Sequence, residues 1–102
     1  MPQPALPPDL LAVLAALPAA ADIDLLLGDL LTPHEREALA ERWEIVKALA
    51  AGHTQRDVRD RLGCSITTVS RGSKQLKYGD GGLALAFDRL AALGHADPRR
   101  GG

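Results

Sequence analysis

The chain has 102 residues, of which 46% are hydrophobic and only 3% aromatic, and it carries 12 basic and 13 acidic residues for a net charge of −1. This length favours one domain, and a core of Leu, Ala, Val and Ile with few β-branched runs favours an all-α fold. The single cysteine, Cys64, excludes an intrachain disulfide, and no apolar stretch reaches the roughly 20 residues of a membrane span. We therefore expect a cytoplasmic protein without a signal peptide, since no basic region precedes the first apolar run.

The N-terminal third predicts an irregular arm followed by two apolar helices. Residues 1–8 hold four prolines and should form a flexible arm. The first helix is expected over residues 9–17, where Pro18 stops it, and its apolar side chains lie nearly all round. Such a short helix is more typical of a subunit interface than of a monomer surface. We expect the second helix to be capped by Asp22 and to run to about Leu31.

The third helix has the strongest local start signal in the chain. Thr32, Pro33 and Glu35 predict a capping box with proline at the first helical position. The helix should run over residues 33–51 and end at Gly52. Arg42 lies at the edge of its apolar stripe, and a guanidinium in that position should have a partner.

Residues 54–77 predict two short helices joined by a glycine turn. Thr54 and Ser65 are placed as N-caps, and Gly63 should end the first helix in a left-handed conformation. The stretch carries six basic against two acidic residues, whereas residues 1–53 carry three basic against eight acidic residues. A basic helix pair of this kind is typical of a helix-turn-helix that meets a phosphate backbone, so a near-neutral net charge does not exclude nucleic acid.

After this pair, residues 78–82 predict a loop and residues 83–93 a last helix ended by Gly94. Residues 95–102 predict a disordered, flexible tail. The domain is thus expected over residues 9–94.

Three stretches, LTPHEREALAERWEIVKALAAG (31–52), TQRDV (54–58) and LGCSITTVSRGSKQLK (62–77), resemble the bacterial tryptophan repressor family. The most specific parts are LTPxEREAL and TxSRGSxxLK. The resemblance implies a six-helix intertwined homodimer with a helix-turn-helix DNA-binding head. The tryptophan repressor is itself one of the standard examples of this docking mode.

The resemblance further implies a transcriptional repressor that binds a palindromic operator as a dimer once L-tryptophan, its corepressor, is bound. The indole ring would lie between the guanidinium planes of Arg42 and Arg71, and Leu31 and Thr32 would come from the other subunit. The implied ligand-binding positions are Leu31, Thr32, Arg42, Ile45, Val46, Arg71, Gly72 and Gln75. The implied DNA-binding positions are Gln55, Arg56, Arg59, Ser65, Ile66, Thr67, Thr68, Ser70, Lys74 and Lys77.

This chain departs from the family pattern at three places. Gln75 replaces a serine that helps to hold the ligand's ammonium group, Trp43 replaces a smaller aliphatic residue, and the turn around His53 is one residue shorter. Two other functions are open: a corepressor-independent DNA-binding regulator in which Gln75 fills the pocket, and a helical dimerisation or adaptor module that binds an acidic protein.

The alternative to ligand binding by Arg42 and Arg71 is that both arginines form surface ion pairs with Glu41, Glu44 or Asp57. We predict no enzyme, because the sequence shows no nucleophile–base arrangement, carboxylate pair or glycine-rich phosphate loop. We also predict no metal site, since the three histidines lack paired ligand spacing, and no cofactor beyond the corepressor.

Overall fold

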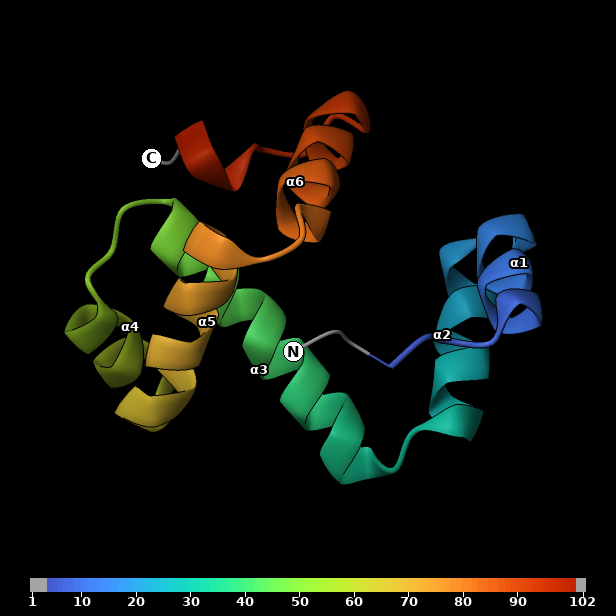
Figure 1. The fold of residues 1–102 in the computed structure, drawn as a ribbon, viewed down its shortest axis with the longest axis horizontal. Helices are drawn as coiled ribbons and strands as arrows, with labels where there is room; N and C mark the ends of the chain where they lie inside the picture. The colour runs from blue at the N-terminus through green and yellow to red at the C-terminus, as the bar shows by residue number, and fades with distance from the viewer. Residues whose placement is uncertain (1–3, 101–102) are drawn as a thin grey trace. The chain divides into compact units, whose positions relative to one another are not determined.

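The structure is a computed structural model that describes residues 4–100. These residues form six α-helices and one short 3-10 helix, and they contain no strand, which confirms the all-α expectation (Figure 1). The helices are α1 (Pro8–Ala16), α2 (Ala20–Leu30), α3 (Pro33–Ala50), α4 (Gln55–Leu62), α5 (Ile66–Tyr78) and α6 (Gly82–Ala92), and the 3-10 helix covers Pro98–Arg100.

The chain divides into two compact units, residues 1–37 and 38–102, and the boundary falls within α3. That residues 9–94 make one domain stays a prediction. The flexible arm was predicted over residues 1–8. Residues 1–3 lie outside the described part, and Pro8 already belongs to α1.

In the first unit, α1 and α2 contain no buried residue. Their exposed side chains include Leu11 at 51% and Leu25 at 70%. The prediction that Asp22 caps α2 is wrong: Ala19 is the N-cap residue and makes no side-chain hydrogen bond. The helix begins earlier, so Asp22 lies in its first turn, where a carboxylate still favours the helix dipole.

The start of α3 has the predicted capping box. The Glu35 N–H donates to Thr32 Oγ1 (3.1 Å), and the Thr32 N–H donates to Glu35 Oε1 (2.9 Å). The Thr32 N–H is the main reason why the pKa of Glu35 lies below its ordinary value. Arg36 then pairs with Asp24 of α2 (2.7 Å), which ties the beginning of α3 to that helix.

The core of the second unit is small and comes from four helices. Its buried residues are Ile45 and Val46 of α3, Val58 of α4, Val69 of α5 and Phe87 of α6. Ile45, Val58 and Val69 make one cluster, so α3 serves as the base on which α4 and α5 pack. The core therefore fixes the helix pair that carries the basic residues.

Part of the predicted disordered tail is ordered, since Pro98–Arg100 form a 3-10 helix, whereas residues 101–102 of that prediction lie outside the described part. Arg99 in the 3-10 turn pairs with Asp97 (2.7 Å) and with Asp88 of α6 (2.6 Å), and its guanidinium lies over the Phe87 ring (5.8 Å to the centroid). The hydrogen bonds from Arg99 lower the pKa of Asp97 to about 2, so this pair stays ionised until the pH falls towards that value. The sequence did not predict this turn because two of the residues that hold Arg99, Phe87 and Asp88, lie on α6.

Candidate functional site

The predicted N-caps and the predicted glycine turn fix the geometry of α4 and α5. Thr54 Oγ1 accepts from the Asp57 N–H (3.1 Å), and Ser65 Oγ accepts from the Thr68 N–H (3.2 Å). Gly63 has φ 67°, the left-handed conformation that its position predicts. Three residues separate the two helices, which pack on each other through fully buried Val58 and Val69. Figure 1 shows α4 and α5 side by side.

A groove of about 530 Å³ runs along the outer side of this pair. It brings together five of the ten predicted DNA-binding residues with one predicted ligand-binding residue. The residues that line it are Gln55, Ile66, Thr67, Ser70, Lys74 and Arg71. Ile66 is 43% exposed at the start of α5, whereas Val69, nearly one turn later, is fully buried in the core. An exposed apolar side chain at this position can meet a thymine methyl group.

The basic residues of the helix pair fall into two groups. Arg59 pairs with Asp60 (2.9 Å) and Arg61 with Asp57 (3.0 Å). Within residues 4–100, no ion pair involves the remaining four basic residues, which are Arg56, Arg71, Lys74 and Lys77. These four cations are therefore available to an external anion.

A second hollow, of about 330 Å³, lies between α3, α5 and α6, and we call it the ligand cavity because it gathers predicted ligand-binding residues. Six of the eight predicted ligand-binding residues line it: Arg42, Ile45, Val46, Arg71, Gly72 and Gln75. The other two, Leu31 and Thr32, lie in the first unit, and their contribution from a second subunit stays a prediction. Four further residues line it that are not among the eight predicted ligand-binding positions: Leu39, Trp43, Thr68 and Leu83.

Two of these missed residues could have been found from the sequence. Leu39 and Trp43 share the apolar stripe of α3 with Arg42, at spacings of three and four. Thr68 was assigned to the DNA-binding face, but it also lines the cavity and its hydroxyl contacts Ser65 Oγ (2.8 Å). Leu83 gives no local signal, because only the fold brings α6 to the cavity.

The charges of the ligand cavity are one-sided. Among the described residues that line it are two guanidinium groups and no carboxylate. Within the described residues, neither Arg42 nor Arg71 forms an ion pair with Glu41, Glu44 or Asp57. Glu44 instead pairs with Lys47 (2.9 Å), and Asp57 contacts His53 and Arg61. An apolar cavity with two free guanidinium groups favours a flat, apolar ligand that carries a carboxylate.

Arg71 belongs to both hollows, since it lines the ligand cavity and the outer groove. A ligand that binds Arg71 thus acts on a residue of the groove.

The model of the family described as Trp repressor protein matches residues 8–91. The chain belongs to the Trp repressor family.

Relatives agree with this assignment. A Trp operon repressor homolog of Vibrio vulnificus (strain YJ016) is 49% identical over 55 residues, which cover 53% of this chain and 54% of the relative. A homolog of the same name from Vibrio cholerae is 47% identical over 55 residues, with 53% of each chain covered. The uncharacterized protein YerC of Bacillus subtilis (strain 168) is 36% identical over 62 residues, covering 61% of this chain and 60% of YerC.

The match to the Vibrio proteins thus spans about half of their length. No solved structure matches the chain. The Trp repressor family is one of transcription regulators, and enzymes are not expected in it. No helix in residues 4–100 has the length and apolar character needed to cross a membrane.

Gly72 has a structural role that the family pattern did not reveal. A Cβ at this position would lie 2.9 Å from Cγ2 of buried Ile45 and 3.6 Å from Cγ1 of Val46. Glycine therefore permits the close approach of α5 to α3 at the floor of the ligand cavity.

Gly72→Ala should lower stability and weaken ligand binding together. Overpacking against Ile45 costs about 1–3 kcal/mol, and the better helix propensity of alanine returns about 1 kcal/mol. Urea unfolding and calorimetric titration measure the two effects. The neighbouring Ser73→Ala, as a matched control, should leave both nearly unchanged, and equal behaviour of the two variants would contradict the packing argument.

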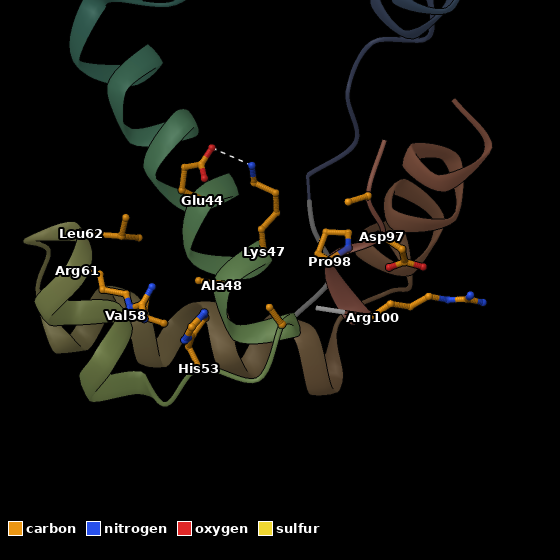
Figure 2. Close-up of a pocket in the computed structure, with 12 residues that line it drawn as sticks. Glu44, Lys47, Ala48, His53, Val58, Arg61, Leu62, Asp97, Pro98 and Arg100 are labelled. Carbon is orange, nitrogen blue, oxygen red and sulfur yellow. Dashed lines mark ion pairs between the residues drawn. The ribbon is translucent and has the colours of Figure 1, made fainter. Parts of the chain in front are cut away.

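A third hollow, of about 860 Å³, lies between α3, α4 and the C-terminal segment (Figure 2). Figure 2 shows Lys47 paired with Glu44 on one side and Asp97, Pro98 and Arg100 on the other. Of the charged residues that line it, Glu44, Lys47, Arg61 and Asp97 are already in ion pairs within the chain, whereas Arg100 forms none with the described residues. The lone Cys64 is half-buried, and burial raises the pKa of its thiol, which does not favour a nucleophile. No group of three metal-binding side chains occurs in the described part of the chain.

Proposed function

We propose that this protein is a DNA-binding transcriptional repressor that acts as a homodimer, with L-tryptophan as its corepressor. The observation that carries the proposal is the double role of Arg71, which lines the ligand cavity and the groove with the predicted DNA-binding residues. Occupancy of the cavity can thereby change the surface that meets DNA.

The chemistry of the cavity suits L-tryptophan. Guanidinium groups stack on aromatic faces and pair with carboxylates, so Arg42 and Arg71 can hold the indole ring while Arg71 also meets the carboxylate. Ile45 and Val46 supply apolar walls, and the volume of about 330 Å³ lies in the range of small-molecule sites. An open cavity of this volume counts against the alternative in which Gln75 fills the pocket.

The outer groove suits DNA. Thr67 and Ser70 offer hydroxyl groups to base edges, and exposed Ile66 offers an apolar contact. Arg56, Lys74 and Lys77 form no ion pair with any residue that the structure describes, so their cations are free to contact phosphates.

The first unit supports the homodimer. Helices α1 and α2 bury none of their residues within the chain, although leucines such as Leu11 and Leu25 project from them. A second copy that covers these helices would remove this apolar surface from water and bring Leu31 and Thr32 to the ligand cavity. We propose the six-helix intertwined dimer of the family as the arrangement.

The first experiment is calorimetric titration of the full chain with L-tryptophan, followed by selection of binding sites from a random DNA pool with and without it. We expect one ligand per chain and enrichment of a palindrome only when ligand is present. A coupling free energy of about 1–3 kcal/mol between the binding of L-tryptophan and the binding of DNA is typical of allosteric proteins. Equal enrichment without ligand would favour the corepressor-independent regulator, and no enrichment would favour an adaptor module that binds an acidic protein.

The salt dependence of operator binding provides a quantitative prediction. If Arg56, Lys74 and Lys77 of both subunits neutralise phosphates, a plot of log affinity against log salt should have a slope of about −5, at −0.9 per phosphate. Lys77→Ala should make that slope shallower by about 2, since each dimer loses two contacts. Arg61→Ala, whose guanidinium is already held by Asp57, is the control and should leave the slope unchanged. If Lys77→Ala and Arg61→Ala gave the same salt slope, Lys77 would not contact phosphate in the complex.

A further inference from the structure

The C-terminal turn reaches the ligand cavity through a continuous chain of contacts. Arg99 lies over the Phe87 ring, 5.8 Å from its centroid. The Phe87 ring in turn meets the Trp43 ring at a centroid distance of 5.7 Å and an interplanar angle of 39°. Trp43 lines the cavity itself. Two successive contacts, Arg99 with Phe87 and Phe87 with Trp43, thus join the turn to the wall of the cavity.

Arg99 also fixes the helix that supplies another wall. Its Nη2 donates to Asp88 Oδ1 (2.6 Å) on α6, while Nε and Nη2 donate to the two oxygens of Asp97 (3.0 and 2.7 Å). Asp88 follows Phe87 directly, and Leu83, one helical turn before Phe87, lines the cavity. The guanidinium therefore holds α6 at the level of Phe87 and Leu83.

The burial of Phe87 makes this arrangement sensitive to Arg99. Phe87 is 1% exposed and is the only buried residue of α6. The helix therefore depends on one aromatic anchor, with Trp43 packed on that ring and the Arg99 guanidinium lying over it. Loss of the guanidinium would expose one face of the Phe87 ring to water and remove the hydrogen bond that Arg99 donates to Asp88.

We infer that Arg99 is a positioning residue for the ligand cavity, which acts through Phe87 on Trp43 and Leu83. The inference rests on the proposed function for the identity of the ligand, but not for the geometry of the cavity. It adds a residue to the ligand-binding apparatus that touches no ligand, and it makes the C-terminal turn part of the effector site.

Arg99→Ala tests the inference against Arg100→Ala, a variant that loses the same charge from the same turn but has no ion pair in the described part of the chain. Trp43 is the only tryptophan of the chain, so its fluorescence in ligand-free protein reports the cavity wall. We expect Arg99→Ala to increase the quenching of Trp43 by acrylamide and to shift its emission to the red. Calorimetry, at a temperature where circular dichroism shows both variants folded, should give L-tryptophan binding about threefold to thirtyfold weaker than wild type. Arg100→Ala should behave as wild type.

Two further variants separate positioning from general stability. Arg99→Lys keeps a cation beside Asp88 and should recover part of the affinity. Asp88→Asn should reproduce the direction of the Arg99→Ala effects, and it replaces Arg99→Ala if that variant fails to fold. If Arg99→Ala and Arg100→Ala showed the same acrylamide quenching of Trp43 and the same affinity for L-tryptophan, the inference would be overturned. If the wild type binds no L-tryptophan, the proposed function fails, and the quenching comparison alone decides the role of Arg99.

Discussion

Arg71→Ala should abolish the response of operator binding to L-tryptophan and weaken L-tryptophan binding itself by roughly tenfold to a hundredfold. A hydrogen bond between charged groups is worth about 1.5–3 kcal/mol, which corresponds to this range of affinity. Arg71 lines the ligand cavity, which contains no carboxylate, and forms no ion pair within the described residues. Its loss therefore removes a ligand contact without leaving an internal partner unpaired.

The effect of Arg71→Ala on DNA should be different in kind. Because Arg71 also lines the outer groove, basal non-specific binding should weaken slightly, while the difference between liganded and free protein disappears. Calorimetry measures the first loss, and fluorescence anisotropy of a labelled selected site, with and without L-tryptophan, measures the second. Arg89→Ala removes a guanidinium from α6 that belongs to neither hollow and should preserve both properties. A normal tryptophan response in Arg71→Ala would refute the assignment of Arg71.

Local signals in the sequence predicted the helix pair well. The caps at Thr54 and Ser65 and the left-handed Gly63 involve residues at most four apart, so their hydrogen bonds are nearly independent of the rest of the fold. The capping box of Thr32 and Glu35 is local in the same sense. The N-cap of α2 was predicted wrongly at Asp22, because α2 begins at Ala20 without any side-chain cap. Asp22, although suited to capping, therefore lies inside the first turn.

The candidate site could be predicted only where it follows helical periodicity or the family pattern. Arg42 and Arg71 lie on two different helices, and their common cavity was implied by the resemblance rather than by spacing. Leu83 joins the cavity through the packing of α6, and no local pattern relates it to α3. The turn around Arg99 depends on Asp88, eleven residues earlier. Long-range pairs of this kind are fixed by tertiary packing.

Phe87→Ala should destabilise the second unit by about 3–5 kcal/mol, the usual cost of removing a large buried aromatic side chain. That is a large part of the roughly 5–15 kcal/mol by which domains are stable. Phe87 is the only buried residue of α6, and its ring contacts Trp43 and the Arg99 guanidinium, so the variant should also release the C-terminal turn. Urea unfolding at a fixed protein concentration measures the loss.

Phe87→Leu separates burial from aromatic contact. Leucine keeps most of the apolar volume, and a volume-conserving exchange costs about 1.5 kcal/mol or less. It removes, however, the aromatic contact with Trp43, worth about 0.5–1.5 kcal/mol, and the face on which the guanidinium lies. We therefore expect Phe87→Leu to fold stably but to leave Trp43 more accessible to quencher than in wild type. Equal loss of stability in both variants would mean that the aromatic contacts, rather than buried volume, hold α6 on α3.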